Sequence, residues 1–395
     1  MRTLGKTLFV WIVIAAIVGA ACGIASAAFL YLLAEVTVIR VQHQAIVFAL
    51  PLAGLLIGTA YARLGAAIQA GNNLVIDTIH DAGPELPLRM VPMVMIGTVL
   101  THLFGGSAGR EGTAVQMGAA MADWVNHRVK LNPELRRAIL VAGVAGGFGS
   151  VFGTPWAGAM FGIEFVRLRR FELRAIVPAV IAAVAGDEVT RACGIVHTAY
   201  PAVAATSLTF PLVLRWLALA IVVAATAVVF IELTHALKRR GARHVRHLGV
   251  RMAIGGAIVV GLWQLVGTSD YLGLGIPGIT SAFAAPTEPY VFALKLVFTA
   301  VTLGAGFQGG EVTPLFFIGA TLGAALAPLL GLPQPLAAGV GLAAIFGAAS
   351  NTPIALSVMA VELIGWNALP HVAIVAGVAY MLAGRRSIYS AQLAR

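Results

Sequence analysis

Long stretches without a charged residue most constrain how this chain can fold. Residues 8–34, 45–62 and 216–231 contain no Asp, Glu, Lys or Arg. A helix needs roughly 20 apolar residues to cross the hydrocarbon core of a bilayer. The first stretch is too long for the apolar part of a signal peptide, and apolar segments continue to the C-terminus. The sequence therefore predicts an all-α polytopic membrane protein.

Charged residues make up only 11% of the 395 residues, too few to cover a soluble protein of this size. The net charge of +10 comes partly from two basic clusters between apolar stretches. These clusters are Arg167, Arg169, Arg170 and Arg174, and then Lys238, Arg239, Arg240, Arg243, Arg246 and Arg251. We interpret them as cytoplasmic loops under the positive-inside rule, not as a nucleic-acid site. With Arg2 and Lys6, this predicts that both termini are cytoplasmic.

The chain resembles itself at an offset of 198 residues. Residues 143–164 share eight identities in 22 positions with residues 341–362, including T-P-x-A followed by a glutamate, Glu164 or Glu362. We predict two repeats, at about residues 1–200 and 205–395, within one transmembrane domain that carries no cytoplasmic regulatory domain. Such halves are often inverted, so that their broken helices meet near the bilayer midplane.

The glycine-rich turn at residues 105–113 precedes a predicted helix that starts at or near Glu111. Free N–H groups and partial positive charge at such a start suit an anion. We predict that Gly109, Arg110 and Gly112 belong to an anion site. The Glu111 carboxylate can occupy that site, or swing away when it is protonated. The alternative is a carboxylate that only caps the helix.

The counterpart of this turn is G-G-E-V-T-P at residues 309–314. A proline fits the first turn of a helix, where its missing N–H costs little. We expect the N–H groups of Glu311 and Val312 to hold an anion, with the Thr313 hydroxyl as a further donor. Glu311 is a second carboxylate at membrane depth, where such groups are functional candidates.

Two further segments have weaker signals. Gly71 and Asn72 lie at the start of a short predicted helix at residues 72–81, where the asparagine is either an ordinary N-cap or an amide aimed at a ligand. A lone tyrosine such as Tyr389 is usually an interface anchor, and motif chemistry does not select it.

Together these segments resemble the CLC family of chloride channels and proton-coupled anion antiporters. Its G-[KR]-E-G-P segment with the gating glutamate is matched by residues 109–113, and its G-x-F-x-P segment by residues 310–314. Its late tyrosine, whose hydroxyl faces the central ion, is matched by Tyr389. The resemblance implies a CLC-type fold of two inverted repeats and a homodimer with one pathway per subunit.

Three departures point to one branch of that family. Asn72 stands where chloride-selective members have the pore serine, Val312 replaces a phenylalanine, and Thr113 replaces a proline. These departures are similar to the bacterial fluoride/proton antiporters. The resemblance thus implies fluoride export in exchange for protons across a bacterial inner membrane, with Glu111 as the gating, proton-carrying carboxylate.

Proton-coupled chloride members also have an inner glutamate beside a structural one. Alignment of the T-P-x-A helix puts Glu164 at the structural position and Phe165 where the inner glutamate would be. We therefore predict Glu311 as the candidate inner proton relay.

Two other functions remain open on the sequence. A passive CLC-type chloride channel has the same fold, although Asn72 argues against it. A membrane enzyme or cation transporter could use Glu111 and Glu311 as paired carboxylates. Because Cys22 and Cys193 lack motif spacing and no nucleotide or haem motif occurs, we expect no enzyme activity, no metal and no cofactor.

Overall fold

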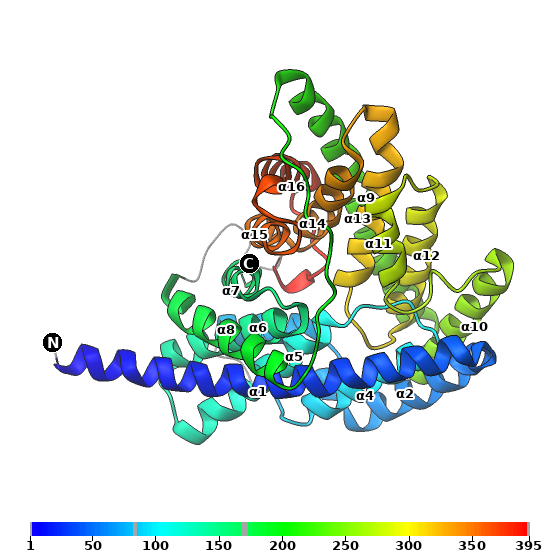
Figure 1. Ribbon diagram of the computed structural model, residues 1–395. Helices are drawn as coiled ribbons and strands as arrows, with labels where there is room; N and C mark the ends of the chain where they lie inside the picture. Colours follow the sequence, from blue (N-terminus) through cyan, green and yellow to red (C-terminus); the bar gives the residue numbers. More distant parts are fainter. Residues whose placement is uncertain (1, 82–84, 167–172, 393–395) are drawn as a thin grey trace.

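The computed structural model describes residues 2–81, 85–166 and 173–392, which contain sixteen α-helices and no strand (Figure 1). The first eight are α1 (Arg2–Gln42), α2 (Leu50–Leu64), α3 (Asn72–Asp81), α4 (Met90–Leu103), α5 (Glu111–Val129), α6 (Pro133–Phe152), α7 (Pro155–Phe165) and α8 (Ile176–Ala192). The others are α9 (Phe210–His244), α10 (Leu248–Val266), α11 (Ile276–Ala284), α12 (Tyr290–Ala305), α13 (Val312–Leu330), α14 (Gln334–Ser350), α15 (Pro353–Ile364) and α16 (Leu369–Ala383).

Seven of the helical segments within the described residues are long and apolar enough to cross a bilayer. They include most of α1 and all of α9, whose large apolar side chains are partly exposed, as lipid-facing residues are. The 41 residues of α1 run as a long rod along one side of the molecule (Figure 1). The predicted all-α, multi-pass membrane architecture is confirmed.

The helices after residue 209 repeat the order and packing of those before it. Helix α5 packs on α6 as α13 packs on α14, and α1 packs on α8 as α9 packs on α16. Both α5–α6 and α13–α14 approach through glycines, since a Cβ at Gly118 would collide with the carbonyl of Gly143, and one at Gly319 with that of Gly341. An extended segment at residues 195–209 connects the two sets of helices. The boundaries proposed for the repeats stay a prediction.

The repeated T-P-x-A helices, α7 and α15, cap each other. The Glu362 carboxylate at the end of α15 accepts hydrogen bonds from the N–H groups of Trp156 (3.0 Å) and Ala157 (2.7 Å) at the start of α7. In the same way, the Glu164 carboxylate at the end of α7 accepts hydrogen bonds from the N–H groups of Ile354 (3.2 Å) and Ala355 (2.8 Å) at the start of α15. Each carboxylate satisfies orphan donors and offsets the positive end of its partner helix. This exchange explains why both glutamates follow T-P-x-A at the same distance.

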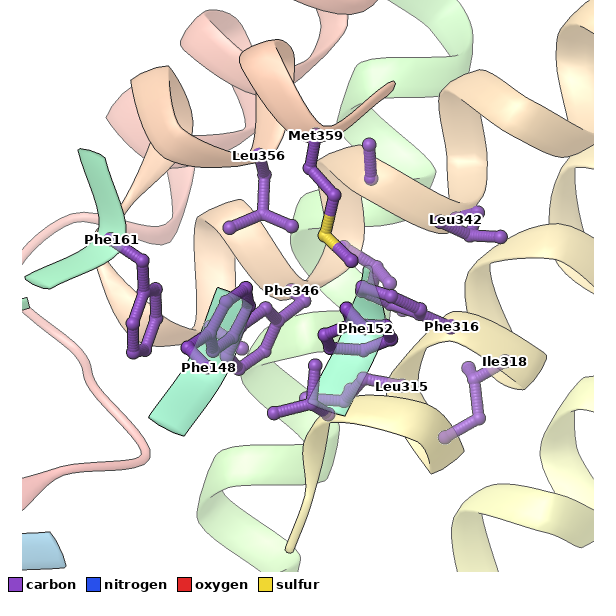
Figure 2. Close-up of a cluster of buried hydrophobic side chains, with 14 of the residues drawn as sticks. Phe148, Phe152, Phe161, Leu315, Phe316, Ile318, Leu342, Phe346, Leu356 and Met359 are labelled. Atoms are coloured by element: carbon purple, nitrogen blue, oxygen red, sulfur yellow. The ribbon is translucent and has the colours of Figure 1, made fainter. Parts of the chain in front are cut away.

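Aromatic side chains from both sets of helices share one core (Figure 2). Phe152 of α6 lies 5.3 Å from Phe316 of α13 between ring centroids, and Phe161 of α7 lies 6.0 Å from Phe346 of α14. These rings are buried. The two halves are therefore one packed body instead of separate modules.

One sequence expectation needs correction. The second basic cluster was predicted to be a loop, but it lies mainly in the last turns of α9 and the first turn of α10. Lysine and arginine are good helix formers and are favoured near helix C-termini, so these residues extend α9.

The first basic cluster is only partly described. Arg174 pairs with Glu134 at 2.9 Å between exposed side chains. Arg167, Arg169 and Arg170 lie outside the described residues.

The exchange of caps predicts the effect of Glu362→Ala. Loss of two hydrogen bonds to a carboxylate should destabilise the protein by about 1–3 kcal/mol and lower the Tm in detergent. Glu188→Ala, at an exposed site on α8, is the matched control and should leave the Tm unchanged. Equal Tm values for the two variants would contradict a stabilising role for the exchanged caps.

Candidate functional site

Two glycine-rich turns from distant parts of the chain meet at the centre of the site. Gly109 and Gly310 form an antiparallel bridge, in which each N–H donates to the other carbonyl at 2.5 and 2.7 Å. A Cβ at Gly109 would lie 2.9 Å from the Gly310 oxygen, so this approach requires glycine. The bridge holds the starts of α5 and α13 against each other.

The Glu111 carboxylate lies on the first turn of α13. It accepts from the N–H of Thr313 at 3.2 Å and from the Thr313 hydroxyl, and also from the N–H of Arg110 at 3.1 Å. The Arg110 Nε lies 3.5 Å from Glu111 Oε1. Glu111 is fully buried. A negative group thus occupies a set of N–H and O–H donors at a helix start, which is an arrangement that suits an anion.

One residue of α13 supplies the donors to Glu111. The carboxylate accepts from the N–H and the hydroxyl of Thr313, and the sequence had pointed to that hydroxyl as an anion donor. The expected role of the Glu311 and Val312 N–H groups toward a bound anion stays a prediction. Helix α13 begins at Val312, with Glu311 as its N-cap, so the Thr313 N–H belongs to the first turn and lacks an intrahelical acceptor.

Glu311 lies buried beside the Glu111 carboxylate. Its carboxylate is within hydrogen-bonding reach of the Tyr389 hydroxyl, and the charge of Glu111 acts on it. Its Oε1 atom has no hydrogen-bond partner in the described part of the chain. The structure thus brings together the two carboxylates and the tyrosine singled out from the sequence.

Asn72 begins α3, as expected, but it is not an ordinary N-cap. Its Oδ1 is buried and makes no hydrogen bond among the described residues, so the capping alternative is wrong. Its Nδ2 would lie 3.0 Å from a Cβ placed on Gly112, so the amide lies close to the first turn of α5. Gly71, at a positive φ of 58°, turns the chain into α3.

Tyr389 is held by residues that sequence reasoning missed. Asn73 Oδ1 accepts from the N–H of Ala391 at 2.9 Å and from Ser390, which ties the start of α3 to the C-terminal segment. The Tyr389 N–H donates to Ser387 Oγ at 3.0 Å. No local motif marks Asn73, because its partners Ser390 and Ala391 lie 317 and 318 residues away in the sequence.

Phe165 packs against the same tyrosine. The two rings are edge-to-face at 5.0 Å between centroids, and Phe165 is fully buried. The carbonyl of Phe165 accepts from Gln392 Nε2 at 2.7 Å. An apolar ring therefore fills the position where the sequence comparison with proton-coupled chloride members placed a missing glutamate.

A cavity of about 460 Å³ opens beside Asn72, Glu311 and Tyr389. We call it the basic cavity, because Lys238, Arg239, His235 and Arg251 line it. The charge of Lys238 acts on Glu311. The sequence had assigned the lysine and arginines only to membrane anchoring, since their approach to the site depends on the packing of α9 and α10. A cavity lined by one sign of charge concentrates ions of the other sign.

Comparison with known proteins identifies related chains. Residues 53–384 match the family model described as voltage gated chloride channel. A "Chloride/fluoride channel protein" from Pseudomonas syringae pv. tomato is 46% identical over 97% of this chain and 86% of its own length. An "H(+)/Cl(-) exchange transporter ClcA" from Vibrio parahaemolyticus is 27% identical over 99% of this chain and 91% of its own.

Solved structures agree with these matches. A crystal structure of a CLC-type fluoride/proton antiporter superposes with a TM-score of 0.94 at 34% identity, covering 98% of each chain. A slow cyanobacterial Cl⁻/H⁺ antiporter superposes with a TM-score of 0.85 at 19% identity, covering 98% of this chain and 97% of its own, and this likeness concerns the fold alone.

Proposed function

The chain belongs to the voltage-gated chloride channel (CLC) family, and we propose that it exports fluoride from the cell in exchange for protons. The observation that carries this proposal is the Glu111 carboxylate on the donors of α13. A carboxylate in that place stands where a transported anion would bind. The names of the Pseudomonas relative and of the 34% identical structure, which both include fluoride, support the choice of anion.

Exchange follows from competition for the same donors. Ionised Glu111 and fluoride both seek the Thr313 N–H and hydroxyl, so one displaces the other. A hydrogen bond to an ionised carboxylate is roughly twice as strong as one between neutral groups. A proton on Glu111 removes the negative charge and therefore weakens its hydrogen bonds to Thr313. Fluoride moving outward and a proton moving inward on Glu111 are then coupled, and the proton gradient drives export.

Fluoride is small and strongly hydrated, so a path must replace the water it loses with hydrogen-bond donors. The Asn72 amide, the Tyr389 hydroxyl and the Thr313 hydroxyl supply neutral donors around the carboxylates. Hydrogen bonds to a charged acceptor are the strong ones, which favours this donor-rich lining for a small anion. The basic cavity would raise the local anion concentration at the entrance.

Glu311 is proposed as the inner proton relay. It lies beside Glu111, contacts Tyr389 and borders the basic cavity, while Phe165 offers no titratable group. A second negative charge beside Glu111 costs free energy at this depth. A proton on either carboxylate lowers that cost, which favours passage of the proton between them.

The cellular setting is also a proposal. We propose a bacterial inner membrane with both termini cytoplasmic, so that the basic cavity at the end of α9 opens to the cytoplasm. The active form would be a homodimer with one pathway per subunit. The described residues contain no group of three or more His, Cys, Asp or Glu side chains placed to hold a metal.

A passive CLC-type chloride channel is the second candidate, because the Pseudomonas relative is named a channel. Purified protein in liposomes distinguishes the two. We expect fluoride efflux to exceed chloride efflux and to acidify the lumen in step with it, because each fluoride that leaves is exchanged for protons that enter. Equal fluxes of the two anions without proton movement would establish the channel instead.

Glu111→Gln should reduce proton movement in this assay to the leak of empty liposomes. The amide cannot carry a proton through the cycle, although it still fits the site. The matched control is Glu188→Gln at the exposed position on α8, which should retain wild-type coupling. Unchanged coupling in Glu111→Gln would refute the gating role.

Glu311→Gln tests the inner relay separately. We expect fluoride flux to continue while the number of protons moved per fluoride falls, because Glu111 loses its internal proton partner. The readout is the ratio of proton flux to fluoride flux. A lower amount of active protein reduces both fluxes equally and leaves this ratio unchanged. A wild-type ratio would reject Glu311 as the relay and leave the role of Glu111 intact.

A further inference from the structure

A second cavity, of about 290 Å³, lies at the start of α11 and the end of α1. Its polar lining includes Thr37, Arg40, Gln44, Ser269 and Asp270, and Ile276 of the first turn of α11 borders it. This volume holds a halide with part of its hydration shell. The cavity shares no lining residue with the basic cavity.

Arg40 is an uncompensated cation in this cavity. The residue is only 8% exposed, and its buried Nε has no hydrogen-bond partner. Its guanidinium forms no ion pair with a described residue. Its Nη2 packs against Gly273, where an added Cβ would lie only 2.8 Å away. Burying a charge without a counter-charge is costly, so this side chain calls for an anion.

Other basic groups share the surroundings of Arg40. Lys295 is fully buried and donates to the carbonyls of Tyr271 at 3.2 Å and Gly273 at 2.7 Å, and the charge of Arg40 acts on it and on buried His102. The one carboxylate in the cavity lining, Asp270, is exposed and beyond ion-pairing distance of Arg40. The positive charge therefore has no acidic partner among the described residues.

The nine-residue helix α11 contributes its start to this cavity. Gly275, at a φ of 77°, is the N-cap, and Pro277 is in the first turn. The N–H groups of Gly278 and Ile279 donate to the Gly275 carbonyl at 3.0 and 3.3 Å, and Pro277 has no N–H. The N–H of Ile276, which borders the cavity, is therefore the donor left for an anion, at the end of the helix that carries partial positive charge.

The second cavity also has the position that the repeat predicts. The basic cavity is bounded by the start of α3, the end of α9 and the start of α10. The second cavity is bounded by the start of α11, the end of α1 and the turn before α2. Helices α3 and α11, α1 and α9, and α2 and α10 hold the same places in their halves. Arg40 thus occupies a place like that of Lys238 in the other half.

We propose that the second cavity binds a small inorganic anion, a halide, with Arg40 as its counter-charge and the Ile276 N–H at the start of α11 as its backbone donor. This site is separate from the Glu111 gate and does not depend on the proposed fluoride/proton exchange.

Bromide is a suitable probe, because anomalous scattering locates it and its effect on the Tm can be titrated against gluconate at constant ionic strength. We expect a bromide peak in the second cavity of the wild-type protein. Arg40→Met should abolish that peak and weaken the affinity measured there by roughly thirtyfold or more. Arg63→Met, which removes an exposed arginine at the end of α2, should retain both.

A purely structural arginine would behave differently. Without bromide, Arg40→Met should melt no lower than the wild type, because the variant removes an uncompensated buried charge. If Arg40→Met melts lower and keeps the bromide peak, Arg40 is structural and the proposal is overturned. Absence of a peak in the wild-type protein also overturns it.

Discussion

This fold depends on one constraint, which is that several helices begin inside the protein instead of at its surface. Each leaves N–H groups that no intrahelical carbonyl accepts, and each carries partial positive charge. In three places the partner is a carboxylate from the other half of the chain: Glu362 on α7, Glu164 on α15 and Glu111 on α13. The halves are therefore joined by electrostatics as well as by the shared aromatic core.

The three carboxylates do not have equal freedom. Glu164 and Glu362 each receive two backbone N–H groups from the first turn of a partner helix. Glu111 instead accepts from a single residue of α13, Thr313, and from the N–H of Arg110, its neighbour in the sequence. It also has a second carboxylate and a solvent-accessible cavity near it. The same physical device thus serves as a fixed cap in two places and suits an exchangeable gate in the third.

Positive charge is distributed according to the same two-half plan. Lys238, Arg239 and Arg251 line one cavity, and Arg40 borders the other. In the basic cavity, the charge of Lys238 interacts with that of Glu311. In the second cavity, Arg40 has no acidic partner among the described residues.

The sequence by itself determined the membrane class, the helix starts at Asn72 and Glu111, and the placing of two carboxylates at glycine-rich turns. These features follow from apolar run length and from turn chemistry, which act over a few neighbouring residues. Only the tertiary structure decided that Thr313 is the donor to Glu111, that the Asn72 side chain does not cap α3 and that the α9 cations face a cavity. Those outcomes depend on contacts between residues that are far apart in the sequence, such as Glu111 and Thr313, which are separated by 202 positions. Patterns of neighbouring residues do not show which distant residues will meet.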